Sequence, residues 1–277
     1  MSLMTDAFSI ILVEPQNPIN LGTVIRAMKN MGFGRLSLVN PAPMAFDKTQ
    51  ISAHHTEDML ERMACFKTLD EALQECHESY GFSARVRSQT WATVAVEDAV
   101  ARMLGVAERG GRVAMVFGRE QTGLTNEELE RCTFQVHIPT TEYSSLNLAQ
   151  AVLIAMYEIR RQRQKGETHV DAACQEIGNY APGSLPATLD QQRRLVQAIG
   201  DALVQVGYFK SEAPNAAVHR VQNILTRARL HEDEIHLLMG MCREVGNYAR
   251  LLKRGIEPTT FRPKNSLLDG ENADESP

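Results

Sequence analysis

The sequence predicts an α/β protein in which helices cover both faces of a parallel sheet, followed by a small all-α appendage. From residue 8 to about residue 165, short apolar runs rich in β-formers alternate with helical patterns. The connections between them are short, which favours parallel strands joined by crossover helices. Beyond residue 187 the β-rich runs stop, and only helical periodicity remains.

Five apolar runs predict the strands. They lie at residues 8–13, 35–39, 78–82, 112–117 and 134–138. They are nearly continuous in apolar residues, as expected for strands that are buried on both faces.

Helices are predicted at residues 20–31, 68–76, 97–108, 125–131 and 147–163. Thr68 and Thr125 are each followed three residues later by Glu, the capping-box pattern that satisfies unpaired amides at a helix start. The helix at 147–163 is apolar nearly all round, which predicts burial inside the domain or at a subunit contact.

The remainder of the chain divides into three parts. Residues 166–187 are polar, with Pro182, Gly183 and Pro186, and are predicted to be a linker. Thr188 opens a third capping box, and apolar steps of three and four predict a helical domain over residues 188–254. Residues 255–277 are predicted to be a disordered acidic tail. The first domain therefore spans residues 1–165.

Composition limits the class of protein. A chain of 277 residues with 43% hydrophobic content can bury a full core. Its five cysteines are scattered, with no CxxC pair and no His at a ligand spacing, which predicts reduced thiols, a cytoplasmic location and no metal. No run approaches the roughly 20 apolar residues of a membrane span, and the N-terminus lacks the basic region of a signal peptide.

The net charge of −5 hides local basic clusters, because four acids lie in the last ten residues. Residues 220–254 contain seven bases against four acids, and a second cluster precedes the linker. Such clusters contact phosphate backbones, although each taken singly could equally be a solvated face. The candidate RNA-binding residues are Arg160, Arg161, Arg163, Lys165, Arg227 and Arg229.

Polar insertions follow three of the predicted strands, and each opens a helix. The first holds Asn20, Gly22 and Arg26, the second Gly118, Glu120 and Gly123, and the third Ser144, Ser145 and Asn147. Because ligands bind at the carboxyl ends of parallel strands, the three junctions predict one shared pocket. The fingerprints GxGxxG and GxxxxGK[ST] are missing, which disfavours an ordinary dinucleotide or nucleoside triphosphate enzyme.

These segments resemble the three motifs of the SPOUT superfamily of RNA 2′-O-ribose methyltransferases. The matching segments are NLGTVIR from Asn20, FGREQTGL from Phe117 and IPTTEYSSLNLA from Ile138. With Gly81–Ala84 and the helical C-terminal segment, the resemblance is greatest to the bacterial branch that modifies nucleotide 32 of tRNA. It covers residues 8 to about 165, and residues 190–250 more loosely.

The resemblance implies transfer of a methyl group from S-adenosylmethionine to a ribose 2′-hydroxyl of C or U in the tRNA anticodon loop. It also implies a homodimer, with the site near the subunit contact, and a trefoil knot in the C-terminal part of the α/β domain. It assigns catalysis to Arg26 and Ser145. The implied cofactor pocket consists of Phe82, Ser83, Ala84, Gly118, Ile138, Ser144, Ser145 and Leu146.

The same residues allow other interpretations of the site and of the chain. Arg26 could be a plain surface arginine, and the two serines could cap the helix at 147–163 while also lying beside a ligand. Glu120, Asn20 and Asn147 are interpreted as supporting residues that brace loops through hydrogen bonds. The chain as a whole could be a catalytically inactive RNA-binding module of the same fold, or could methylate rRNA ribose.

Overall fold

The computed structural model describes residues 5–42, 57–84, 93–142, 145–165, 185–209 and 214–255. Ser144, the Lys165 side chain, most of the predicted linker and nearly all of the predicted tail lie outside the described residues.

Seven parallel strands form one sheet in the order β3-β2-β1-β6-β4-β7-β5. Their bounds are β1 (Phe8–Val13), β2 (Arg35–Val39), β3 (Ala64–Phe66), β4 (Glu78–Phe82), β5 (Thr93–Ala95), β6 (Val113–Phe117) and β7 (Phe134–His137). The five predicted strands are confirmed. The two edge strands, β3 and β5, were not predicted, because three residues are too few to show a pattern.

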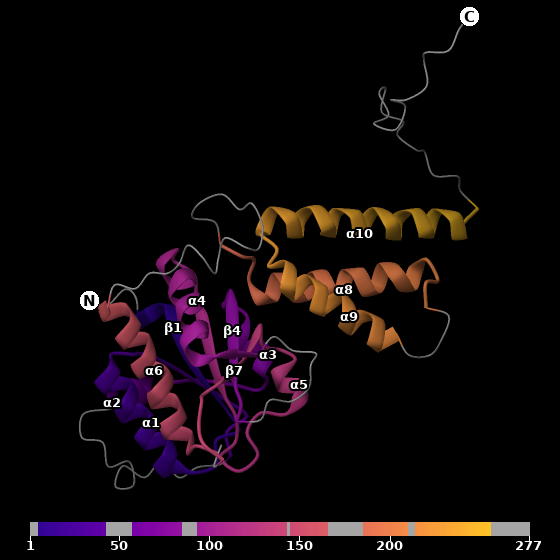
Figure 1. The fold of residues 1–277 in the computed structure, drawn as a ribbon. Helices are drawn as coiled ribbons and strands as arrows, with labels where there is room; N and C mark the ends of the chain where they lie inside the picture. Colours follow the sequence, from indigo (N-terminus) through magenta and orange to yellow (C-terminus); the bar gives the residue numbers. More distant parts are fainter. Residues whose placement is uncertain are drawn as a thin grey trace, which may run out of the picture.

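Helices cover both faces of the sheet (Figure 1). On one face lie α1 (Pro18–Met31), α4 (Val96–Glu108) and α6 (Leu148–Lys165), and on the other α3 (Leu69–Leu73) and α5 (Asn126–Leu129). A further short helix, α2 (Glu57–Arg62), packs near β2 and was not predicted. The strands are apolar throughout because successive side chains of a strand enter different cores: Ile10 and Leu12 pack on the first face, Ile11 and Val13 on the second.

Helix α1 begins two residues earlier than predicted. The Asn17 side chain accepts a hydrogen bond from the Ile19 backbone amide at 2.8 Å and so caps the helix, with Pro18 in its first turn. Gly22 lies inside the helix, within the predicted range, and is buried. The predicted helices at 68–76 and 125–131 are shorter than expected, although both capping boxes form as predicted.

Helix α6 is buried on one side only. Val152, Met156 and Ile159 face the core, whereas Leu153 and Tyr157 are 37% and 54% exposed. The prediction of burial is therefore right for one side of the helix. The other side leaves apolar side chains on the surface, next to α1.

Three C-terminal helices, α8 (Leu189–Gln205), α9 (Pro214–Ala228) and α10 (Glu232–Lys253), form a helical unit around Ala187, Leu195 and Ile235. It docks at the amino end of β4, where the Leu189 amide donates to the Cys76 carbonyl at 2.9 Å and Arg229 pairs with Glu78. The unit therefore lies beside the sheet at the end where β4 begins, as seen in Figure 1.

Candidate active site

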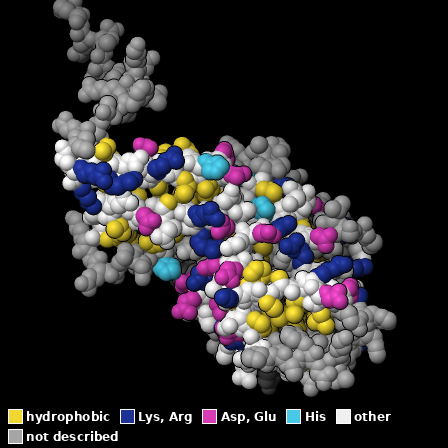
Figure 2. All heavy atoms as spheres, turned by 180° about the vertical axis from the view of Figure 1, so that it is seen from behind, with side chains coloured by type: hydrophobic (Ala, Val, Ile, Leu, Met, Phe, Trp, Pro, Cys, Tyr) yellow, Lys and Arg dark blue, Asp and Glu magenta, His cyan; other side chains and the backbone are white. Residues whose placement is uncertain are grey.

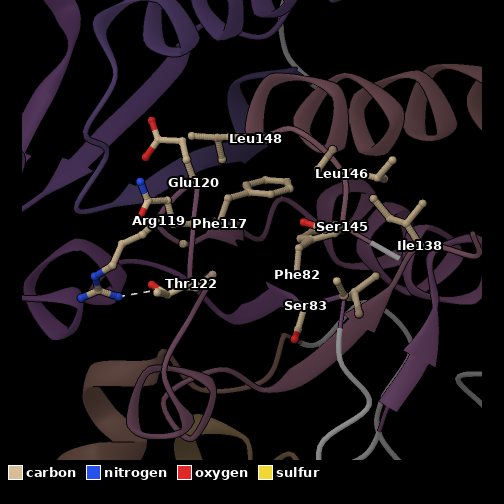
Figure 3. Close-up of a pocket in the computed structure, with 16 residues that line it drawn as sticks. Phe82, Ser83, Phe117, Arg119, Glu120, Thr122, Ile138, Ser145, Leu146 and Leu148 are labelled. Atoms are coloured by element: carbon tan, nitrogen blue, oxygen red, sulfur yellow. Dashed lines mark hydrogen bonds between the residues drawn. The ribbon is translucent and has the colours of Figure 1, made fainter. Parts of the chain in front are cut away.

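A cavity of about 220 Å³ opens at the opposite end of the sheet, where β4, β6 and β7 finish. Figure 3 shows Arg119, Glu120 and Thr122 on one side of it and Ile138, Ser145 and Leu146 on the other. Its lining consists of Phe82, Ser83, Ala84, Phe117, Gly118, Arg119, Glu120, Gln121, Thr122, Gly123, Val136, Ile138, Ser145, Leu146, Leu148 and Ala151.

Hydrogen bonds centred on Glu120 join the three predicted junctions. Its carboxylate accepts from the backbone amides of Gln16 and Asn17 at 3.1 and 2.9 Å. It also accepts from the Asn20 side-chain amide at 3.3 Å. The Asn20 oxygen in turn accepts from the Asn147 amide at 3.0 Å, at the start of α6. Segments 100 or more residues apart in sequence thus meet in one network, an arrangement that suits the supporting role expected of these residues.

This network keeps Glu120 ionised. Burial by itself would raise the pKa of its carboxyl group, but hydrogen bonds from the backbone and from Asn20 outweigh burial and lower the pKa below its usual 4.5. A carboxylate held in this way is a structural anchor rather than a proton carrier near neutral pH.

Among the described residues, Arg119 is the only basic residue that lines the cavity. Its positive charge is balanced by two carboxylates. Its guanidinium pairs with Glu14 at 2.8 Å and with Glu128 at 3.0 Å, and both partners raise its pKa. Figure 3 shows the side chain extending away from the hollow. A positively charged ligand would therefore meet little repulsion from Arg119.

The second junction closes tightly on itself. A Cβ atom at Gly118 would lie 2.1 Å from the carbonyl carbon of Gly123, a contact no side chain can make. Gly123 has a φ of +68°, in the left-handed region that favours glycine. The glycines are therefore required by the shape of the loop, which brings backbone groups of residues 118–123 to the cavity wall.

The interior of the cavity is largely apolar. The rings of Phe82 and Phe117 stack with centroids 4.4 Å apart and an angle of 14° between them. Val136, Ile138 and Leu148 add aliphatic surface. Such a lining suits a flat, partly apolar ligand that is oriented by a few polar groups.

Most residues assigned to the cofactor pocket come together. Phe82, Ser83, Ala84, Gly118, Ile138, Ser145 and Leu146 all line the cavity. Seven further lining residues were not predicted: Phe117, Arg119, Gln121, Thr122, Val136, Leu148 and Ala151. The first four lie within the second motif, which was the available signal. Val136 lies inside β7 and Leu148 and Ala151 lie in α6, where an apolar residue is indistinguishable from ordinary core.

Arg26, by contrast, does not line this cavity. It lies on the exposed side of α1, between the core-facing Ile25 and Ala27, and its side chain makes no hydrogen bond or ion pair with another described residue. Its neighbours on that side, one and two turns back, are Thr23 and Ile19, and Ile19 is 62% exposed. Of the two residues assigned to catalysis, Ser145 therefore lines the cavity and Arg26 does not.

The candidate RNA-binding arginines differ in their surroundings. Arg163 and Arg227 are exposed, and Arg160 donates to the Met31 carbonyl at 3.3 Å. Arg161 pairs with Glu158 at 2.6 Å, which offsets its charge. Arg229 does not fit the prediction: its side chain is only 11% exposed and pairs with the buried Glu78, which removes it from any basic surface.

Nowhere in the described part of the chain do three or more His, Cys, Asp or Glu side chains group as metal ligands would. None of the helices that the structure describes has the length and apolarity needed to cross a bilayer.

Comparison with known proteins gives consistent matches. Residues 7–157 match the model of the SpoU rRNA Methylase family. The tRNA (cytidine/uridine/adenosine-2′-O-)-methyltransferase TrmJ of Pseudomonas aeruginosa is 33% identical over 89% of the chain and 96% of the relative. TrmJ of Pectobacterium atrosepticum, a tRNA (cytidine/uridine-2′-O-)-methyltransferase, is 35% identical over 87% and 98%. The crystal structure of TrmJ from Z. mobilis ZM4 aligns with a TM-score of 0.70 and 26% identity, over 86% of this chain and 98% of that one.

Proposed function

Since this chain belongs to the SpoU methylase family, we propose that it methylates the ribose 2′-hydroxyl of a cytidine or uridine in the tRNA anticodon loop, at nucleotide 32. The observation that carries this proposal is the cavity in which the three junctions meet around Glu120. Relatives matched over most of their length are named for tRNA, which favours tRNA over rRNA as the substrate.

S-adenosylmethionine fits the cavity by chemistry, and it supplies a methyl group activated by a positively charged sulfur. The apolar surfaces of Phe82, Ile138 and Leu146 suit its adenine ring, and backbone groups of residues 118–123 suit its polar edges. The guanidinium of Arg119, neutralised by Glu14 and Glu128, does not oppose a cationic ligand.

We also infer the trefoil knot. β7 lies on the far side of β4 from β6, yet α6, which follows β7, packs against α1 and α4. The chain must return across the carboxyl ends of β4 and β6, beside the loop of residues 118–123. Passage through that loop would thread the chain and fix the cavity walls to one another.

A homodimer would bring Arg26 of one subunit close to Ser145 of the other. The exposed sides of α1 and α6 carry Ile19, Leu153 and Tyr157, apolar side chains that a subunit contact would bury. Symmetric pairing through this face would place Arg26 of the partner subunit at the cavity that holds Ser145.

Catalysis depends mainly on positioning the ribose 2′-hydroxyl, because the methyl group is already activated. Arginine keeps its proton far above neutral pH and so is a poor general base. Arg26 of the partner subunit therefore holds a phosphate or the developing alkoxide, while the proton leaves through that phosphate, a water or Ser145.

Mixed dimers test this arrangement. Arg26→Ala and Ser145→Ala homodimers should each be inactive. Co-expression of both chains gives heterodimers in about half of the molecules, each with one site that has both residues intact. The mixture should recover about a quarter of wild-type activity. No recovery, with heterodimers present, would mean that both residues act within one chain.

Cofactor binding distinguishes this function from its alternatives. Thermal stabilisation by S-adenosylmethionine but not by NAD or ATP supports the methyltransferase over a nucleotide-dependent enzyme of another kind. Labelled methyl transfer to tRNA would exclude an inactive RNA-binding module, and transfer to rRNA alone would favour the ribosomal alternative. Action on tRNA implies a cytoplasmic location.

A further inference from the structure

The outer face of α10 exposes a row of apolar side chains that no described residue covers. Leu237, Met241, Val245, Tyr248 and Leu252 are 42% to 61% exposed. They follow one another at steps of four, four, three and four residues, so they lie along one side of the helix. Such a regular row is more than the scattered apolar residues that any protein surface carries.

This row is not needed for the fold of the helical unit. The buried residues of α10, Ile235, Gly246 and Ala249, lie about a third of a turn around the helix from this row, on the side that packs on α8. At Gly246 an added Cβ would lie 2.8 Å from the Gln205 side chain, so the two helices approach closely there. Helix α10 is thus anchored by the side that packs on α8, and the row beside it stays largely exposed.

Most charges of α10 lie at its ends, apart from Arg243 and Glu244 in the middle. Its first turn contains Glu232, Asp233 and Glu234, and its last turn contains Arg250 and Lys253. In Figure 2, dark-blue basic side chains gather at the end of the helical unit where α10 terminates. A second α10 running antiparallel would set acidic ends against basic ends, whereas a parallel one would bring like charges together.

The spacing of the row also suits antiparallel pairing. Leu237 and Leu252 lie equally far from the point between Glu244 and Val245, and so do Met241 and Tyr248. A two-fold axis through that point would place each leucine against a leucine and each methionine against a tyrosine. We propose that α10 is a self-association surface, which pairs antiparallel with α10 of a second copy of this chain.

This contact is separate from the proposed α1 and α6 contact, because it uses other helices. One pair of helices buries less surface than a stable interface needs, so the association is expected to be weak and dependent on concentration. Its failure would leave the proposed methyltransferase function untouched.

Disulfide cross-linking tests the proposal in the full-length chain with Cys65, Cys174 and Cys242 replaced by Ser. Val245→Cys should give a covalent dimer on mild oxidation, because the two copies of residue 245 would lie beside the axis. Leu237→Cys alone should not, because its two copies would be about 22 Å apart at 1.5 Å rise per residue. An equimolar mixture of Leu237→Cys and Leu252→Cys should cross-link.

Arg243→Cys is the matched control, since residue 243 is exposed on the same helix but lies off the row. It should remain uncross-linked. Cross-linking of Leu237→Cys with itself would overturn the antiparallel arrangement. Absence of a Val245→Cys cross-link, or one no stronger than that of the control, would overturn the self-association surface.

Discussion

At the scale of single residues, Glu120 is the side chain that unites the site. Replacing it with Gln removes a charged acceptor and turns an amide group toward the amides of Gln16 and Asn17. We expect Glu120→Gln to lower the free energy of unfolding by about 1–3 kcal/mol at pH 7. Urea denaturation measures this change, and an unaltered midpoint would show that the network contributes nothing.

The stability difference between wild type and Glu120→Gln should also depend on pH. Because the pKa of Glu120 is below 4.5 in the folded protein, its stabilising contribution is present above pH 4.5. That contribution is lost as the pH falls through the folded-state pKa. The difference in unfolding free energy between wild type and Glu120→Gln should therefore shrink below pH 4.5. A difference that stays constant from pH 7 to about pH 3 would contradict this assignment.

Two cysteines are protected by their surroundings. Burial raises the pKa of both Cys76 and Cys132 to about 12, so neither is a thiolate near neutral pH. We expect an alkylating reagent at pH 8 to modify the exposed Cys65 in the native protein and to leave these two unmodified until urea is added. Peptide mass spectrometry identifies the sites, and rapid native modification of Cys132 would contradict its burial.

At the scale of elements, one ion pair fastens the helical unit to the sheet. Arg229, at the turn between α9 and α10, pairs with Glu78 at the start of β4, and the Tyr80 hydroxyl donates to the same carboxylate at 2.5 Å. Glu78 is 1% exposed. Arg229 thus couples an element of the helical unit to the centre of the α/β domain.

Loss of this pair should be costly, because it leaves a buried carboxylate without its cation. We expect Arg229→Ala to lower the free energy of unfolding by about 3 kcal/mol, with partial recovery in Arg229→Lys. Arg227→Ala, two residues away and exposed, is the matched control and should be nearly neutral. Equal effects of the two alanine variants would show that Arg229 acts only as surface charge.

The elements also show what sequence patterns can and cannot predict. β1 was predictable because its alternate residues enter two cores, which makes every position apolar. β3 and β5 were not, because pairing at a sheet edge and not local pattern creates such short strands. The charge of an arginine did not predict its surroundings: Arg229 is buried against an acid 151 residues away, and Arg26 is exposed and does not line the cavity.

At the scale of the whole molecule, the pocket and the helical unit lie at opposite ends of β4. A tRNA that reaches both must cross a large surface, on one subunit or on two. The net charge of −5 would repel it, so we expect binding to depend on local basic residues such as Arg163 and Arg227.

The dependence of tRNA affinity on salt concentration measures the contribution of these basic residues. We expect affinity for tRNA to fall steeply as salt rises from about 50 to 200 mM, and Arg163→Ala or Arg227→Ala to reduce the slope by about one each. Arg229→Lys, which keeps the buried ion pair, should leave the slope unchanged. A flat response in the wild type would remove these arginines from RNA binding.

The most direct measurement is mass spectrometry of unmodified tRNA after incubation with the protein and methyl-labelled S-adenosylmethionine. The proposed activity predicts one labelled methyl group on the ribose of a cytidine or uridine at nucleotide 32, lost in Ser145→Ala. A label on a base, a label only outside the anticodon loop, or no label with cofactor bound would contradict it.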